Sequence, residues 1–191
     1  TPNGYLAHKV VPWFEKRTGA KFNYIPCLAG GIFKLTNNTP PLIATANVKN
    51  KADYFFTEIN RFIEKHKLTK FKNNSYFPQN SLNIQRGAVA AEKLGILMEY
   101  IECTMTAMWE KDLNIQELDV LKKALNDDGI DHETIFNMIQ TQECKDKLIA
   151  NTSWAVESGA FGIPTFLIDD QIFFGKDHLY QLEEYINNRK I

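Results

Sequence analysis

The stretch GAFGIPTFLIDDQIFFGKDHL, residues 159–179, decides the fold class of this 191-residue chain. Its opening residues are rich in glycine and end in Pro164, which is typical of a turn that leads into a strand. Residues 165–168 and 171–174 are mostly β-branched or aromatic, and the two aspartates between them suit a tight turn. We therefore predict an antiparallel hairpin.

A helix is predicted directly after this hairpin. Gly175 ends the second strand, and three apolar residues then repeat at helical spacing, which indicates one buried helical face. These residues are Leu179, Leu182 and Ile186. The carboxyl end of the chain therefore has the order strand, strand, helix.

The start of the sequence predicts a helix followed by a strand. Thr1 suits the N-cap, and Pro2 suits the first helical position because an N–H there would have no partner anyway. Gly19 suits the C-terminal cap, and residues 21–25 alternate as in a strand. The apolar residues expected on one face of the helix are Leu6, Val10, Trp13 and Phe14.

The middle of the chain predicts an irregular loop and then helices. Residues 29–41 contain paired glycines, asparagines and prolines, which favour a long loop. Asp131 is expected to cap a helix, with Ile130 and Ile135 at the spacing of a hydrophobic staple. Further helical patterns cover residues 53–66, 86–109, 115–125 and 143–156. This arrangement indicates an α/β layer interrupted by an all-helical insertion.

Composition excludes several classes of protein. The 22 Lys and Arg residues balance 23 Asp and Glu residues, so the chain has no excess positive charge with which to bind nucleic acid. No apolar run is long enough to cross a bilayer, so we expect no membrane partner. The 13 Phe, 7 Tyr and 3 Trp residues supply ample apolar surface for a core.

The cysteines predict neither a disulfide framework nor a metal site. There are three, Cys27, Cys103 and Cys144, and they lie far apart in the sequence. An odd number at wide spacing argues against both arrangements, so we expect reduced, partly buried thiols and no bound metal. Reduced thiols and the lack of a charged-then-apolar leader favour a cytoplasmic location.

Three segments of the chain resemble the 2-hydroxychromene-2-carboxylate isomerase family and the related kappa-class glutathione transferases, which belong to the DsbA-like group. The segments are TPNGYLAHK at residues 1–9, GGIFK through NTPP at residues 30–41, and FGIPT through FGKD at residues 161–177. The resemblance implies a thioredoxin-like fold with an inserted all-helical domain, and a homodimer. Family members begin one strand earlier, so the first strand is expected to be missing from the sequence as given. We place the thioredoxin-like domain at residues 1–45 and 140–191, and the helical insertion at residues 46–139.

The resemblance implies a glutathione site at the start of the first helix. The two cysteines of the DsbA-like group correspond to Thr1 and Gly4, so dithiol–disulfide exchange is not expected. The isomerase and kappa families carry a hydroxyl residue, usually serine, at the position of Thr1, where it hydrogen-bonds the sulfur of glutathione. A helix N-terminus also favours an anion such as a thiolate, through its free N–H groups and its dipole. The alternative is that Thr1 serves only as a helix cap.

The same resemblance implies further contacts to glutathione. Pro164 is expected in the cis isomer, with the backbone of Ile163 offered to the tripeptide by strand addition. The pair Lys176 and Asp177 matches residues that bind the γ-glutamyl end; the alternative is that Asp177 only complements the helix dipole.

Two more residues are implied to contact glutathione from the irregular middle segment. Asn38 matches an asparagine that contacts the tripeptide. Lys51 matches a lysine that pairs with its glycine carboxylate, and Lys49 is nearly as suitable. The alternative for either lysine is a solvated loop charge.

The implied activity is that of a glutathione-dependent isomerase. It would act on an unsaturated aromatic pyruvate of the 2-hydroxychromene-2-carboxylate type by reversible thiolate addition. The expected partners are glutathione and a small hydrophobic aromatic substrate, for which Phe55, Phe62 and Phe77 are candidate pocket residues. Two alternatives stay open: a kappa-like transferase or peroxidase that uses the same site, and a thioredoxin-fold binding module without turnover.

Overall fold

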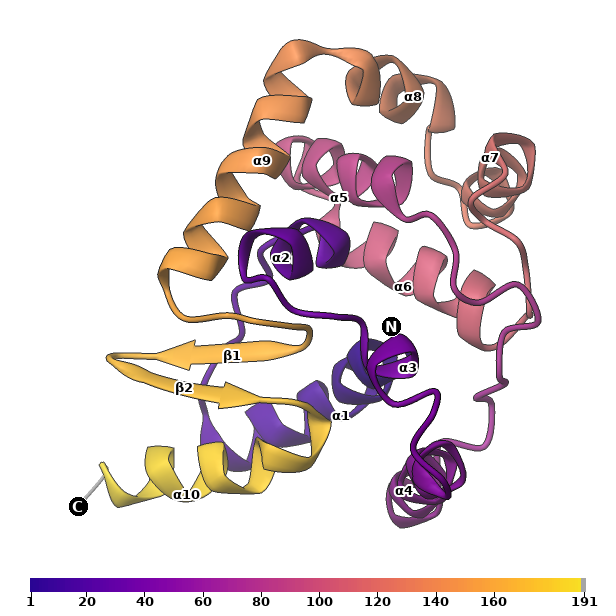
Figure 1. Ribbon diagram of the computed structural model, residues 1–191. Coiled ribbons are helices and arrows are strands. Elements are labelled where there is room, and N and C mark those ends of the chain that lie inside the picture. Colours follow the sequence, from indigo (N-terminus) through magenta and orange to yellow (C-terminus); the bar gives the residue numbers. More distant parts are fainter. Residues whose placement is uncertain (190–191) are drawn as a thin grey trace. The chain divides into compact units, whose positions relative to one another are not determined.

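The computed structural model describes residues 1–189 (Figure 1). These residues divide into two compact units. The first, which we call the hairpin unit, contains residues 1–24, 32–69 and the segment from Ala155 onward. The second, the helical unit, contains residues 25–31 and 70–154. The expected insertion at residues 46–139 stays a prediction, because compactness alone does not test which segment folds as a domain.

The hairpin unit is built on the predicted pair of strands. Strands β1 (Thr165–Ile168) and β2 (Gln171–Phe174) pair antiparallel, from Thr165 opposite Phe174 to Ile168 opposite Gln171. Asp169 has a φ of 52°, as a two-residue turn of this kind requires. The predicted hairpin is therefore confirmed residue by residue.

Helix α1 (Pro2–Thr18) begins and ends where the sequence predicted. The side chain of Thr1 accepts the N–H of Gly4 at 3.0 Å, and Gly19 closes the helix with a φ of 72°. Three of the four expected core residues are buried: Leu6, Val10 and Phe14. The expectation for Trp13 is wrong, since 48% of its surface is exposed.

Three further helices of the hairpin unit surround α1. They are α4 (Lys51–His66), the 3-10 turn η1 (Lys176–His178) and α10 (Leu179–Asn188), and each contacts α1. Figure 1 shows α10 directly after the hairpin, at the yellow end of the colour range. The predicted apolar face of α10 is confirmed, because Leu179, Leu182 and Ile186 are all buried.

Two predictions for the segment after α1 are wrong. Residues 21–25 lie outside the sheet, which has two strands in the described part of the chain. Their alternation sets which side chains face inward, but a strand also needs ladder hydrogen bonds from a neighbour. The expected loop at 29–41 instead contains helices α2 (Ala29–Leu35) and α3 (Pro41–Ala44). Gly31 of α2 allows close packing, since a Cβ there would lie 2.9 Å from Thr152 Cγ2.

The helical unit packs α5 (Leu82–Leu94) against α6 (Leu97–Trp109) and α8 (His132–Gln140). Helix α6 also packs against α7 (Leu118–Asp127). A single helix over 86–109 was expected, but Gly95 ends α5 with a φ of 75° and α6 begins two residues later. The predicted cap of α8 is confirmed, because the Asp131 carboxylate accepts the N–H groups of Glu133 and Thr134. The remaining helix is α9 (Gln142–Glu157), and its last residues, from Ala155 onward, belong to the hairpin unit.

Candidate functional site

The first turn of α1 leaves hydrogen-bond donors available to a ligand. Pro2 has no N–H, and the N–H groups of Gly4 and Tyr5 are bonded to the side chain and the carbonyl of Thr1. The N–H of Asn3 and the hydroxyl proton of Thr1 have no acceptor among the described residues. A hydroxyl that accepts one bond can still donate another, so capping does not prevent Thr1 from donating to a ligand.

The loop before β1 adjoins this first turn. A Cβ at Gly4 would lie 3.2 Å from Thr1 Oγ1 and 4.0 Å from Ile163 Cγ2, which places Ile163 beside the start of α1. The peptide bond between Ile163 and Pro164 is cis, as expected. Within residues 1–189, the backbone N–H and C=O of Ile163 have no hydrogen-bond partner. Two unused backbone groups at a strand start can bind an extended peptide.

The η1 turn is fixed to the same loop. The N–H of Gly175 donates to the carbonyl of Pro164 at 2.9 Å. Lys176 and Asp177 come directly after Gly175 in the chain, so this hydrogen bond holds them near the cis proline. Lys176 is 2% exposed, and its ammonium lies 2.5 Å from Asp177 Oδ2. The side chain of Asp177 is 54% exposed and stays within reach of a ligand.

Asn38 supports the loop before Pro164. Its side-chain N–H donates to the carbonyl of Phe161 at 2.9 Å, and its side-chain oxygen accepts the N–H of Thr39 at 2.8 Å. One N–H and one lone pair of the carboxamide remain for a ligand. The structure therefore gathers Thr1, Ile163 and Asp177 around one loop that Asn38 braces.

Comparison with known proteins identifies the family. A DSBA-like thioredoxin domain matches residues 2–187. The chain belongs to this family. The kappa 1 glutathione S-transferase of Rattus norvegicus is 26% identical over all of the chain and 88% of the relative. The 2-hydroxychromene-2-carboxylate isomerase of Sphingobium xenophagum is 23% identical over 97% of the chain and 93% of the relative.

A solved structure confirms the fold of this DSBA-like chain. It is a 2-hydroxychromene-2-carboxylate isomerase with a TM-score of 0.83 and 19% identity, and the match covers 98% of the chain and 90% of that structure. The thioredoxin-like fold class expected from the resemblance is thereby confirmed. The two named relatives are a glutathione transferase and an isomerase.

Lys51 is the first residue of α4 in this DSBA-like chain. It lines a cavity of about 120 Å³ formed by α3 and the start of α4, together with Leu42 and Phe55. No hydrogen bond or ion pair of residues 1–189 joins Lys51 or the exposed Lys49 to the loop around Pro164. The role of Lys51 in binding glutathione stays a prediction.

The three phenylalanines proposed for a substrate pocket do not share one cavity within a unit. Phe55 lines the small cavity beside Lys51, and Phe62 lines a larger cavity of the hairpin unit. Phe77 belongs to the helical unit, where its ring packs against Trp109 at 5.4 Å between centroids. Helical periodicity in the sequence does not show which residues line the same cavity.

Gly162 lies beside Ile163 in the candidate site, and the sequence analysis did not single it out. It is buried, and a Cβ there would lie 2.8 Å from Cε2 of Phe174, the last residue of β2. Gly162 therefore sets how closely the loop before Pro164 approaches the end of β2. In the sequence, its position directly before Ile163 and the cis proline could have indicated this role.

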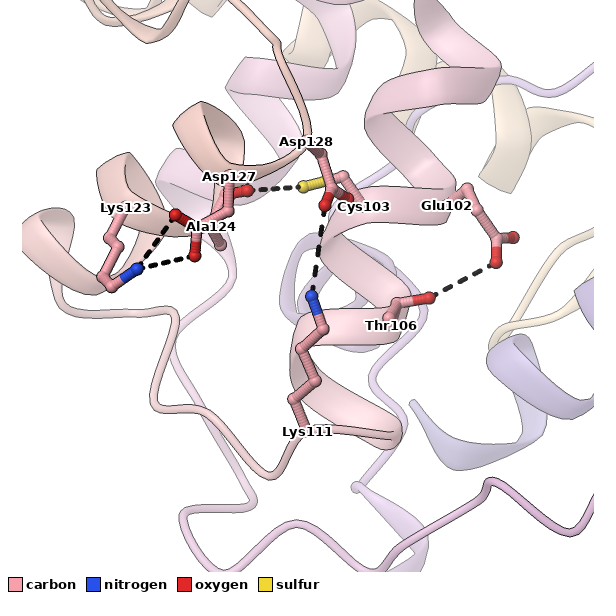
Figure 2. Close-up of polar contacts among 8 residues, drawn as sticks. All are labelled: Glu102, Cys103, Thr106, Lys111, Lys123, Ala124, Asp127 and Asp128. Atoms are coloured by element: carbon pink, nitrogen blue, oxygen red, sulfur yellow. Dashed lines mark hydrogen bonds and ion pairs between the residues drawn. The ribbon is translucent and has the colours of Figure 1, made fainter.

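The cysteines take no part in the site. All three are free, and Figure 2 shows the Cys103 thiol donating to the carbonyl of Ala124, at 3.4 Å. Burial, followed by the nearby Asp128, raises the pKa of Cys103 to about 12, and burial raises the pKa of Cys27 to about 11. Burial also raises the pKa of Cys144. Thiols with such pKa values are protonated near neutral pH and are poor nucleophiles.

Two other kinds of site are absent from the described residues. No group of three or more His, Cys, Asp or Glu side chains in residues 1–189 is placed to hold a metal ion. Over the same range, no helix combines the length and the apolar character needed to span a bilayer.

Proposed function

We propose that this chain is a glutathione-dependent isomerase that acts on an unsaturated aromatic pyruvate of the 2-hydroxychromene-2-carboxylate type. The observation that carries the proposal is the unused hydroxyl proton of Thr1 beside Ile163, whose backbone N–H and C=O are also unused. Relatives named as 2-hydroxychromene-2-carboxylate isomerases, at 20–23% identity over nearly the whole chain, support the substrate class.

The unused groups fit a tripeptide thiol. Ile163 offers one donor and one acceptor to the backbone of an extended peptide. The half-exposed carboxylate of Asp177 suits the ammonium of a γ-glutamyl group. Asn38 has one N–H to spare, and Lys51 or Lys49 would take the carboxylate of the glycine.

The chain's own contribution is to stabilise and orient a thiolate. When bound, glutathione supplies a thiolate that adds reversibly to a conjugated double bond and so permits rotation about it. The Thr1 hydroxyl and the Asn3 N–H would both donate to the sulfur, and the α1 dipole favours its negative charge. These interactions lower the pKa of a thiol from its free value of about 8.5. The cis-proline loop fixes the direction from which the sulfur meets the substrate.

The variant Thr1→Val tests the proposed role of Thr1. It removes the donor while keeping the β-branched shape, and Thr1→Ser is the control that keeps the hydroxyl. One charge-assisted hydrogen bond is worth about 1.5–3 kcal/mol, so the pKa of bound glutathione should rise by about one to two units in the valine variant. Ultraviolet absorbance of the thiolate, titrated against pH, measures this value.

The outcomes separate the role of Thr1 from the role of the site. An unchanged pKa in Thr1→Val removes Thr1 from the mechanism. A calorimetric titration without any binding of glutathione overturns the enzyme proposal altogether. Because valine also removes the helix cap, urea unfolding of both variants confirms that they are folded at the titration temperature.

A kappa-like transferase or peroxidase is the second candidate, favoured by the rat kappa-class relative. The two activities differ in stoichiometry. An isomerase leaves the glutathione concentration unchanged while the aromatic pyruvate turns over, whereas a transferase or peroxidase consumes glutathione. Binding of glutathione without turnover of either kind of substrate would instead favour a binding module.

The expected oligomeric state follows from the same resemblance, and the expected location follows from the reduced thiols. We expect a homodimer in the cytoplasm with glutathione and a small aromatic substrate as its partners. Light scattering of the purified full-length protein tests the dimer, and fractionation of the source cells tests the location.

A further inference from the structure

Three apolar side chains in one short segment of the hairpin unit are exposed. They are Leu42, Ile43 and Val48, with 41%, 68% and 52% of their surface exposed. Leu42 and Ile43 belong to α3, and Val48 lies between α3 and α4. Single exposed apolar residues are common on protein surfaces, whereas a group of them marks a site of interaction. We call this segment, residues 41–49, the apolar corner.

Hydrogen bonds hold the apolar corner in a fixed shape. The N–H of Thr45 donates to the carbonyl of Pro41 at 3.0 Å, and the Thr45 hydroxyl donates to the same carbonyl at 2.7 Å. The N–H of Val48 donates to the carbonyl of Thr45 at 3.0 Å. The N–H of Lys51 then donates to the carbonyl of Val48 at 3.1 Å, which ties the corner to the start of α4. The apolar side chains are therefore exposed on a folded segment.

Positive charge is concentrated in the part of the hairpin unit that contains the apolar corner. Residues 32–52 contain three lysines and neither aspartate nor glutamate. The lysines are Lys34, Lys49 and Lys51; all are exposed, and none has an ion-pair partner within residues 1–189. Only one of Lys49 and Lys51 is needed for the carboxylate of glutathione, so the other stays available. Exposed apolar groups beside unpaired cations are complementary to a surface that is apolar inside and negatively charged outside.

A second copy of the chain does not fit the apolar corner. Even an aromatic side chain buries only about 150–250 Å², so three half-exposed aliphatic side chains supply less than about 400 Å². A stable interface buries about 800 Å² on each partner. A two-fold axis through the corner would also bring the lysines of both copies together, and residues 32–52 contain no acidic group to compensate them. We therefore expect the homodimer to use another surface.

We propose that the apolar corner binds the surface of an anionic lipid bilayer. The apolar side chains would enter the boundary between headgroups and acyl chains, and the lysines would lie among the negatively charged headgroups. Such a peripheral contact needs no helix that spans the membrane. The expectation of no membrane partner rested on apolar runs in the sequence, which do not show which side chains are exposed. The inference goes beyond the proposed function, because it requires neither glutathione nor turnover.

Co-sedimentation of the full-length protein with lipid vesicles tests the proposal. Vesicles of phosphatidylcholine that contain phosphatidylserine are compared with vesicles of phosphatidylcholine alone. We expect the partition coefficient to be at least about twentyfold higher on the anionic vesicles, since each of two lysines near the surface contributes about fivefold. Salt at about 1 M shortens the Debye length to about 3 Å and should remove most of this difference. No binding to the anionic vesicles, or equal binding to both kinds, overturns the proposal.

Serine variants test the apolar contribution. Ile43→Ser should weaken binding to the anionic vesicles by about tenfold, and Val48→Ser by about fivefold, because each removes an apolar side chain that would be buried in the bilayer. The matched control is Ile149→Ser, the same change at an isoleucine of α9 that is 62% exposed, and it should leave binding unchanged. Equal effects of Ile43→Ser and Ile149→Ser, including no effect of either, overturn the assignment. Urea unfolding confirms that these surface variants are folded.

Two measurements without vesicles distinguish other uses of the apolar corner. Light scattering of Ile43→Ser should give the same mass as the wild-type protein, and a change from dimer to monomer would assign the corner to a contact between copies and overturn the proposal. Calorimetric titration of Ile43→Ser with glutathione should give the wild-type Kd. Loss of glutathione binding in this variant would place the corner in the glutathione site and likewise overturn the proposal. Absence of glutathione binding in the wild-type protein would overturn the proposed function alone, because the vesicle experiments contain no glutathione.

Discussion

Replacement of Gly162 by alanine should disturb both the stability and the ligand binding of this protein. The added Cβ would lie 2.8 Å from Cε2 and 3.1 Å from Cζ of Phe174. Carbon atoms in contact are about 3.5–4.0 Å apart, so the ring or the loop has to move by roughly 0.7–1.2 Å. The Phe174 ring cannot turn away freely, because Phe161 packs against it at 4.5 Å between centroids.

The expected cost can be worked out from these contacts. Overpacking of this kind destabilises a protein by about 1–3 kcal/mol. The lower entropy of alanine in the unfolded chain offsets about 0.4–1 kcal/mol of this. We therefore expect the free energy of unfolding, measured in urea, to fall by about 1–2 kcal/mol in Gly162→Ala. Binding sites tolerate displacements of about 0.5 Å, so the Kd for glutathione should rise about tenfold.

A double-mutant cycle tests the reasoning. Leucine at position 174 lacks the Cε2 and Cζ atoms, so Gly162→Ala should cost less than about 0.5 kcal/mol in the Phe174→Leu background. An equal cost in both backgrounds would refute the proposed contact. Gly30→Ala is the control, because a Cβ at Gly30 meets nothing within 4 Å.

Two further predictions concern stability alone. A Cβ at Gly87 would overlap the hydroxyl of the buried Tyr100, which donates a hydrogen bond to the carbonyl of Ile84. Gly87→Ala should therefore lower the free energy of unfolding by about 2–4 kcal/mol. An unchanged midpoint of urea unfolding would contradict this prediction. The hydrogen bond from Arg17 lowers the pKa of Glu183 below 4.5, so its stabilisation is present above that pH and is lost as the pH falls through the folded-state pKa. Because both side chains are partly exposed, Glu183→Gln should cost only about 0.5 kcal/mol near pH 7 and nothing in strong acid, which urea unfolding at the two pH values measures.

The sequence predicted those parts of the fold that depend on neighbouring residues. The hairpin, the Thr1 cap and the Asp131 cap each form through hydrogen bonds within a few residues, so residue type and spacing were sufficient. The predictions for 21–25 and 29–41 failed because pairing and close helix packing require groups distant in sequence.

The candidate site likewise contains residues that the sequence located and others that only the tertiary structure placed. The order of motifs located Thr1 and the cis-proline loop, whereas the sequence had no means of placing Lys51 beside a separate cavity. The adjacent residues Lys176 and Asp177 also differ in exposure: the side chain of Lys176 is 2% exposed, and that of Asp177 is 54% exposed.

By itself, then, the sequence determined where elements begin and end, because caps, turns and helical faces are local properties of the chain. Tertiary structure alone decided which donors remain unused and which charges remain unpaired. A hydrogen bond or an ion pair forms with whatever group lies within a few ångströms. In this protein those partners come from residues up to 166 positions away, as in the pair of Arg17 and Glu183.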